Sequence, residues 1–156
     1  MAVMIKVVPV AALDQYVGQE FGPTDWVVLD QSRIDQFAEI TLDKQFIHVD
    51  PARAAKTPFG GTIAHGFLTL SMLAYFQTQA NVIPEGTQMG VNYGLNKVRF
   101  LQPVKSGQRV RGRLKPLSFV QKAAGQILAS YEMTVEIDGE TKPALVAEML
   151  AMFYLA

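Results

Sequence analysis

The sequence predicts an α+β fold in which one long apolar helix packs against a curled antiparallel sheet. Two observations support this class. Apolar side chains occupy most sides of the predicted helix at residues 65–80, which indicates burial on most sides. The chain after Gly86 divides instead into four strand-like runs that turn residues separate, with no helical segment between them. Consecutive strands favour antiparallel links, and their separation from the helices favours the α+β class.

Composition and charge limit the classes of protein to which this chain can belong. It has 156 residues, of which 49% are hydrophobic and 18% charged, and this fits one globular domain over residues 1–156. The formal net charge is zero, so a nucleic-acid or membrane-surface partner has no electrostatic support. The absence of cysteine excludes disulfides and thiolate catalysis, and it fits a reducing compartment.

The N-terminal run MAVMIKVVPVAAL is apolar, but it lacks the features of a signal peptide. Lys6 interrupts the run, and no basic segment precedes a long apolar core. No apolar run in the chain approaches the roughly 18 residues of a membrane span. We therefore expect a soluble protein of the cytoplasm.

The N-terminal half is predicted to hold short elements. These are a helix at residues 9–17, a strand at 25–30, a helix at 32–41 and a short helix at 51–56. Residues 30–32, beginning with Asp30, offer an N-cap for the second helix, and Ser32 with Asp35 resembles a capping box. Asp50 and Pro51 suit the N-cap and the first turn of the third helix. Residues 42–49 show neither helical nor strand periodicity, so we expect a loop there.

The long helix and the four strands make up the second half of the chain. A helix at residues 65–80 would span roughly 24 Å, which is enough to cross a sheet. The expected strands are residues 89–101, 109–120, 126–137 and 142–154, with a two-residue hairpin at Asp138-Gly139. A small sheet wrapped on one helix leaves open edges. We therefore expect a homodimer, with residues 93–95 as the candidate edge.

Asp43 and His48 are the candidate acid–base pair, because both fall in the aperiodic segment between two predicted helices. An imidazole titrates near neutrality and can act as acid or base. Five positions apart in a loop, the two side chains could converge on one small reactant, such as a water molecule. The alternative is that Asp43 caps a helix end and His48 is a buried imidazole with satisfied hydrogen bonds.

Gly66 opens the long helix, where the first backbone N–H groups have no partner within the helix. These donors and the helix dipole could polarise a thioester carbonyl that approaches the glycine. Tight packing of the helix on the sheet would require the same glycine.

His65 could be a second base, but we favour a structural role at the helix start. Ser71 either bonds the carbonyl four residues earlier or orients Asp43.

The chain lacks the common motifs for metals, cofactors and nucleophilic serines. Two histidines without a nearby third ligand make a poor metal site. There is no Gly-x-Ser-x-Gly elbow and no phosphate-cradling glycine loop.

Two stretches of the chain resemble one known family. The first, FAEITLDKQFIHVDPARAAKTPFGGTIAHGFLTLSML, is similar to the hydratase motif of the MaoC-like (R)-specific enoyl-CoA hydratases, members of the hotdog superfamily. The second, VNYGLNKVRFLQPVKSGQRVRG, is similar to the strand region of the branch that includes nodulation-protein-N-like and mycobacterial (R)-hydratases. The resemblance implies a hotdog fold, in which a curled antiparallel sheet wraps a long central helix and the hydratase-motif segment overhangs it.

The same resemblance implies a hydro-lyase, an (R)-specific 2-trans-enoyl-CoA hydratase. Such an enzyme adds water reversibly to an enoyl thioester and yields (R)-3-hydroxyacyl-CoA. Asp43 and His48 match the catalytic pair of the family, and Gly66 matches the glycine whose N–H polarises the thioester carbonyl. Ser71 matches a serine that supports the aspartate in some members. Coenzyme A would be part of the substrate, and no further cofactor or metal is expected.

Substrate contacts outside the motif and the type of acyl group are less defined. Candidates for acyl contacts are Asn92, Tyr93 and Asn96, and candidates for the CoA phosphates are Lys97, Arg99 and the basic group at residues 105–115. Leu42 and residues 44–47 depart from the common family pattern, which leaves the substrate range open, including non-fatty acyl-CoA. Two other functions stay open, an acyl-CoA thioesterase and a non-catalytic acyl-thioester-binding module. The thioesterases of this superfamily normally carry a carboxylate on the central helix, and residues 65–80 contain none.

Overall fold

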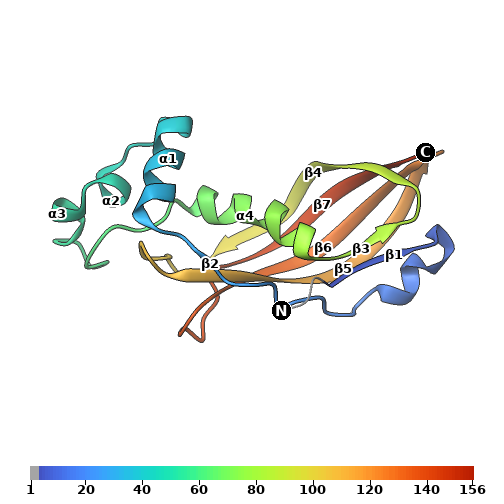
Figure 1. Ribbon diagram of the computed structural model, residues 1–156, viewed down its shortest axis with the longest axis horizontal. Helices are drawn as coiled ribbons and strands as arrows, with labels where there is room; N and C mark the ends of the chain where they lie inside the picture. Colours follow the sequence, from blue (N-terminus) through green and yellow to red (C-terminus); the bar gives the residue numbers. More distant parts are fainter. Residues whose placement is uncertain (1–3) are drawn as a thin grey trace.

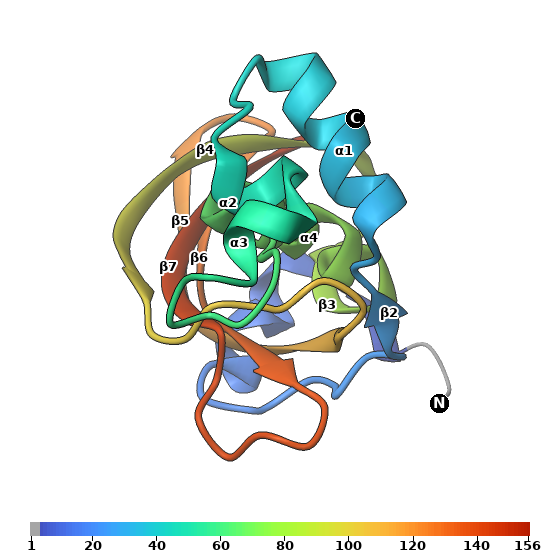
Figure 2. The same cartoon turned by 90° about the vertical axis from the view of Figure 1, so that its left-hand side faces the viewer.

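A five-stranded antiparallel sheet curls around one long helix in the computed structural model, which describes residues 4–156 (Figure 1). The strands lie in the order β2-β5-β6-β7-β4. They are β2 (Val27–Val28), β4 (Thr87–Phe100), β5 (Arg109–Ala123), β6 (Gln126–Ile137) and β7 (Leu145–Leu155). The helix, α4 (Gly66–Gln79), lies inside the curl of the sheet (Figure 2). The predicted α+β class, with a curled antiparallel sheet that wraps a central helix, is confirmed.

The core lies between α4 and the sheet. Leu68, Leu73 and Phe76 of α4 are buried there with the inward side chains of the strands. Gly112 of β5 allows a close approach of the helix, because a Cβ at this position would lie 2.7 Å from the Phe76 side chain. Burial largely alternates along β6, as its period-two sequence predicts.

Three short helices gather at one end of the sheet, beside the N-terminus of α4 (Figure 2). They are α1 (Gln31–Thr41), α2 (Phe46–Val49) and α3 (Pro51–Ala54). The Asp30 carboxylate caps α1 by accepting a hydrogen bond of 2.9 Å from a first-turn N–H. Asp50 caps α3 in the same way at 3.0 Å, with Pro51 in the first turn. This overhanging segment carries Asp43 and His48.

Several local predictions for the helical region are wrong in detail. Of the residues offered as the cap of α1, Asp30 is the N-cap, and the capping box predicted at Ser32 is wrong, because the Asp30 carboxylate accepts from a first-turn N–H. Residues 46–49 form the helical turn α2, where we expect a loop, because four residues are too few to show a helical period. The first helix is a short 3-10 helix, η1 (Val10–Tyr16), and α3 ends at Ala54.

The strand pairing also departs from the expected sequence of neighbours. β5 and β6 are antiparallel neighbours, as are β6 and β7, but β4 pairs with β7 and not with β5. β6 and β7 form the predicted antiparallel pair, but the two-residue loop predicted at Asp138-Gly139 is wrong, because residues 138–144 form a longer loop between them. The two-residue turn lies at residues 124–125 instead, where Gly125 takes a positive φ of 69°.

A second, two-stranded sheet forms where no strand is expected. β1 (Met4–Val8) pairs in parallel with β3 (Ala80–Pro84), which directly follows α4. Residues 4–8 of the apolar N-terminal run thus pair with β3, and Val8 is buried, whereas residues 1–3 lie outside the described part of the chain. Within residues 4–156, no helix has both the length and the apolar character that crossing a membrane requires.

Candidate active site

His48 lies in α2, where the segment before α4 orients its ring. Its Nδ1 lies 2.7 Å from the carbonyl oxygen of Ile63. Because a carbonyl only accepts, Nδ1 carries the proton and Nε2 keeps its lone pair. The Ile63 N–H donates in turn to the Ile47 carbonyl oxygen at 3.0 Å. The ring is 6% exposed, and no partner for Nε2 is found within residues 4–156, so this imidazole is not fully hydrogen-bonded.

Gln31, the first residue of α1, ties α2 to the segment before α4. Its side-chain amide donates to the His48 carbonyl oxygen at 2.7 Å and accepts from the Thr62 hydroxyl at 2.6 Å. Thr62 is buried. Sequence reasoning misses both Gln31 and Thr62, because they lie far from His48 along the chain and no local pattern links them.

Asp43 follows a strained turn at the end of α1. Leu42 ends the helix with a φ of 66°, a left-handed conformation that is unfavourable for a residue with a Cβ, and its side chain is 78% exposed. The exposed Asp43 carboxylate accepts from Gln45 N at 3.4 Å and does not cap α1. A carboxylate oxygen of Asp43 and ring nitrogens of His48 and His65 lie within 4.8 Å of one another. The structure therefore brings the predicted pair together.

His65 lies beside this pair and is buried. Its ring stacks on that of His48, with centroids 3.8 Å apart and planes inclined by 23°. Its Nε2 lies 2.9 Å from the backbone carbonyl oxygen of Asp43. The residue is the N-cap of α4, but its side chain makes no capping hydrogen bond. The side chain of His65 thus contacts the loop that carries Asp43 instead of the helix start.

The surroundings of His48 favour its neutral form. Burial is the largest influence and lowers the pKa of His48 below the ordinary value of 6.5. The hydrogen bond to the Ile63 carbonyl raises this pKa, repulsion from His65 lowers it, and attraction to Asp43 raises it. The net direction is downward, so at neutral pH the Nε2 lone pair is available to accept a proton.

A pocket of about 290 Å³ lies between α2 and the N-terminus of α4, and we call it the His48 pocket. His48, Gly66 and Thr69 line it, with apolar walls that include Ile63 and Phe100. Thr69 is 3% exposed and was not a sequence candidate. Its position three residues after Gly66, on the same helix face, is the signal that identifies it.

The surroundings of Gly66 fit both of the roles that its sequence position suggests. It is the first residue of α4, so its N–H has no acceptor within the helix. It also lines the His48 pocket. At the same time, a Cβ on Gly66 would lie 3.1 Å from the Phe100 ring, so the glycine also permits tight packing.

Ser71 lies away from the Asp43–His48 pair. Its hydroxyl donates to the carbonyl oxygen of Leu68, three residues earlier, at 2.7 Å. Ser71, Asn92 and Tyr93 line a second pocket of about 270 Å³ between α4 and β4, which we call the Ser71 pocket. Asn96 is placed differently, because its amide donates to Glu148 at 3.0 Å. The structure thus groups two of the three acyl-contact candidates and separates Ser71 from Asp43.

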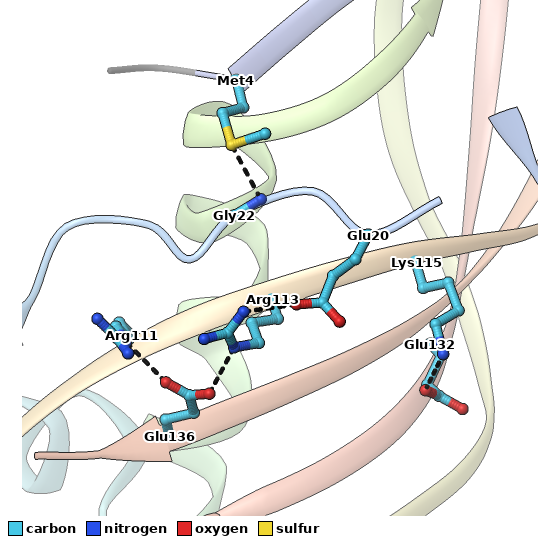
Figure 3. A network of polar contacts seen from close by, with 8 residues as sticks. All are labelled: Met4, Glu20, Gly22, Arg111, Arg113, Lys115, Glu132 and Glu136. Carbon is cyan, nitrogen blue, oxygen red and sulfur yellow. Dashed lines mark hydrogen bonds and ion pairs between the residues drawn. The ribbon is translucent and has the colours of Figure 1, made fainter. Parts of the chain in front are cut away.

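The basic group at residues 105–115 is largely paired with carboxylates. The pairs are Arg109 with Asp138, Arg111 with Glu136, Arg113 with Glu136 and Glu20, and Lys115 with Glu132; Figure 3 shows those of Arg111, Arg113 and Lys115. Burial raises the pKa of Glu136, but hydrogen bonds from Arg111 and Arg113 outweigh it and hold this pKa below its ordinary value. The two arginines alternate with buried residues of β5, so they lie on the sheet face opposite α4. This arrangement disfavours a phosphate site there.

The three side chains of the cluster also raise the question of a metal ion. Asp43, His48 and His65 offer ligand atoms at separations that a divalent cation could bridge. However, one nitrogen of each imidazole already faces a carbonyl oxygen. Stacked, nearly parallel rings keep their lone pairs in two nearly parallel planes, whereas a shared ion needs them to converge on one point. We therefore expect proton chemistry at this site, not metal binding.

Comparison with known proteins gives the family. The model of the MaoC like domain matches residues 13–139. The chain belongs to the MaoC-like family. This MaoC-like chain is 49% identical over 137 residues to nodulation protein N of Rhizobium leguminosarum bv. viciae, which is 87% of the chain and 85% of that protein. The predicted resemblance is confirmed, including its branch.

Two further relatives define the enzyme class and the fold of the MaoC-like chain. It is 44% identical to 3-hydroxyacyl-thioester dehydratase Z of Mycobacterium tuberculosis over 144 residues, 92% of the chain and 95% of that protein. The chain is therefore a hydro-lyase, as predicted. The (R)-hydratase from A. caviae involved in PHA biosynthesis has a TM-score of 0.70 at 22% identity, over 86% of this chain and 94% of that one. The likeness to the A. caviae structure concerns the fold alone, and it confirms the hotdog architecture.

Proposed function

We propose that this MaoC-like hydro-lyase is an (R)-specific hydratase of 2-trans-enoyl-CoA, which adds water reversibly to give (R)-3-hydroxyacyl-CoA. The observation that carries this proposal is the state of His48. Its Nδ1–H is committed to the Ile63 carbonyl, so Nε2 keeps a free lone pair. A ring nitrogen of His48 lies within 4.8 Å of a carboxylate oxygen of Asp43. A neutral imidazole with one free nitrogen is the form that a general base requires. The 44% identity to a mycobacterial 3-hydroxyacyl-thioester dehydratase supports the same reaction class.

In the proposed hydration, His48 Nε2 and the Asp43 carboxylate hold one water molecule against Cβ of the enoyl group. Nε2 takes a proton as the water oxygen bonds to Cβ. The electron pair of the double bond moves toward the thioester oxygen, whose charge the Gly66 N–H stabilises. The protonated His48 then gives this proton to Cα on the same face, the carbonyl re-forms, and the imidazole is neutral again. The reverse sequence of steps removes water from the 3-hydroxyacyl thioester.

We infer that the thioester carrier is coenzyme A and not an acyl carrier protein. Acyl carrier proteins are acidic, so docking one requires an unpaired basic surface. In this chain the arginines of β5 are paired with carboxylates, and the formal net charge is zero. The sheet face that carries these arginines therefore offers little attraction for an acidic carrier protein.

The test is hydration of crotonyl-CoA, followed as the loss of absorbance of the conjugated thioester. The same assay is repeated with a panel of enoyl chain lengths and with a matched enoyl group on acyl carrier protein. Chiral analysis then identifies the product. We expect turnover of enoyl-CoA, with the (R)-3-hydroxy product. Release of free thiol would indicate a thioesterase, and saturable binding without turnover would indicate a binding module. Faster turnover of the carrier-protein substrate would overturn the choice of coenzyme A.

The Ser71 pocket is our proposed site for the acyl chain. It begins about one turn of α4 beyond Gly66, and its walls are mostly apolar, with Asn92 and Tyr93 on the β4 side. Asn96 is left out of this proposal because its amide is bonded to Glu148. Support of Asp43 by Ser71 is left out as well, since the hydroxyl is bonded to the Leu68 carbonyl oxygen.

We also propose a homodimer that forms along β4. This strand pairs with β7 on one side and is last in the sheet, so its other edge is open. Apolar side chains remain uncovered along it, with exposed fractions of 56% for Met89, 60% for Tyr93 and 44% for Leu95. Pairing of two β4 strands about a twofold axis would cover these side chains and complete the edge.

Replacing Val91 on this edge by lysine should convert the dimer into a monomer, because each copy would bring an unpaired charge into an apolar contact. Sedimentation velocity or light scattering at matched protein concentrations measures the outcome. Val120→Lys is the matched control, because Val91 and Val120 are 45% and 46% exposed and Val120 lies on β5, toward the opposite edge. If the dimer persists in Val91→Lys but is lost in Val120→Lys, the interface lies on β5 near Val120, and the proposal of a β4 interface is wrong.

A further inference from the structure

We propose that His65 is a positioning residue of the active site, which holds the Asp43 backbone and the His48 ring in a fixed relation. This inference rests on the hydration proposed above and adds a third side chain to it. His65 acts here through the other two residues and does not itself touch the reacting atoms.

The first contact fixes Asp43. The Nε2–H of His65 donates to the Asp43 carbonyl oxygen at 2.9 Å, across 22 residues of chain. Among the described residues, Asp43 has two other hydrogen bonds, from its own N–H to the Thr41 hydroxyl and from Gln45 N to its carboxylate, and both are 3.4 Å long and exposed. Hydrogen bonds of that length are weak. Within residues 4–156, the bond from the buried His65 is therefore the shortest hydrogen bond of Asp43.

The second contact fixes the His48 ring. The two imidazoles stack at 3.8 Å, and the Phe37 ring also contacts His65, with centroids 4.9 Å apart. The Ile63 carbonyl sets which nitrogen of His48 carries the proton, and the stacked His65 limits where the plane of the ring can lie. Both constraints aim His48 Nε2 relative to Asp43.

The imidazole of His65 does more than fill space. Because Nε2 donates to Asp43, Nδ1 keeps a lone pair, and this buried atom has no hydrogen-bond partner within residues 4–156. An unpaired buried acceptor is destabilising, and a phenyl ring would pack in the same place without it. Packing alone therefore does not explain a histidine here, whereas the bond to Asp43 does.

His65 also influences protonation of His48. The titratable groups that act on His48 are Asp43, from the loop after α1, and His65, from the residue before α4. Repulsion from His65, which acts when the His65 imidazole is protonated, is one of the influences that lower the pKa of His48. Neutral His48 is the proposed base, so the rate falls as the pH falls through this pKa. An uncharged residue at position 65 should raise the pKa and move the acid limb of the rate profile to higher pH.

The first experiment compares His65→Phe and His65→Gln with wild type in crotonyl-CoA hydration. Phenylalanine keeps a ring but loses the donor to Asp43, so we expect kcat to fall by about 10- to 100-fold with KM nearly unchanged. Glutamine can still donate to the Asp43 carbonyl, so it should recover most of kcat while still showing the shifted acid limb. Phe37→Leu perturbs the other ring contact of His65 and serves as the packing control, with kcat near wild type.

The second experiment does not depend on turnover. The chain has 2 histidines, so nitrogen-15 NMR of labelled histidine resolves both rings. We expect opposite tautomers, Nδ1–H for His48 and Nε2–H for His65. In His65→Phe and His65→Gln, the remaining His48 resonance should titrate at higher pH than in wild type.

These results separate the inference from the function on which it rests. If the wild-type protein has no hydratase activity, the proposed function is wrong. The tautomers of His48 and His65 and the titration of His48 would still test the arrangement of the two rings. An active wild type, with His65→Phe at the wild-type kcat and an unshifted His48 titration, would overturn the positioning role alone. A loss of kcat that Phe37→Leu reproduces would reduce His65 to a packing residue.

Discussion

Replacing His48 by asparagine should lower the rate of enoyl-CoA hydration by about a hundred- to ten-thousand-fold. The asparagine amide can still donate to the Ile63 carbonyl, as Nδ1–H does at 2.7 Å, so the turn of α2 should persist. The change removes the Nε2 lone pair, which takes the proton of the attacking water in the proposed mechanism. The measurement is kcat at saturating crotonyl-CoA, with the melting temperature as a check on folding.

Asp43→Asn should give a loss of similar size, because the amide keeps the shape of the side chain but not its charge. Asp14→Asn is the matched control, since Asp14 is an exposed carboxylate in η1, outside the overhanging segment. The double variant at positions 43 and 48 should be little slower than the slower single variant, because the two groups act on one water. Unchanged rates in both single variants would remove this pair from the mechanism.

The elements that the sequence predicts well are those whose signal is local. β6 has the expected bounds, and α4 differs from its expected range by one residue at each end. In both cases the signal lies in or beside the element: β6 alternates and follows a turn at residues 124–125, and α4 is apolar on most sides. The pairing of β4 with β7, and of β1 with β3, depends on how distant segments pack around α4. The sequence of each strand contains no pattern that predicts which strand it pairs with.

The same distinction applies to the site. Asp43 and His48 are close in sequence, so their convergence follows from a short loop and the family motif. The hydrogen bonds that orient them join residues far apart, from Gln31 to the His48 carbonyl and from His65 to the Asp43 carbonyl. Each uses a backbone oxygen as acceptor, which any residue type supplies. A pattern of residue types therefore cannot predict these bonds, although they set the geometry of the pair.

Gly66 is the position where sequence and structure leave two physical explanations standing together. Its N–H is free at the start of α4 beside the His48 pocket, and its missing Cβ makes room for Phe100. The first explanation makes the backbone a catalytic group, and the second makes the glycine a packing residue. Two substitutions of Gly66 separate these explanations, because alanine keeps the backbone N–H and proline removes it.

Gly66→Pro should lower kcat by about a hundred- to a thousand-fold more than Gly66→Ala does, the effect typical of losing one oxyanion donor. Proline suits the first position of a helix, and His65, with φ −57° and ψ 137°, already has the extended backbone that precedes a proline. Both variants place a Cβ about as close to the Phe100 ring, so that packing cost is shared. They differ in the N–H, which α4 itself does not use, and kcat for crotonyl-CoA measures that difference.

A further substitution at Phe100 tests the packing explanation directly. Phe100→Leu makes room beside position 66, so it should restore much of the rate lost in Gly66→Ala but little of the rate lost in Gly66→Pro. If the proline and alanine variants lose the same rate and Phe100→Leu rescues both, the glycine serves packing, and the oxyanion donor has to be sought elsewhere in the His48 pocket. If the proline loss persists, the start of α4 supplies the charge stabilisation. The overhanging segment then supplies the proton chemistry, and the Ile63 and His65 contacts hold these two parts of the site in register.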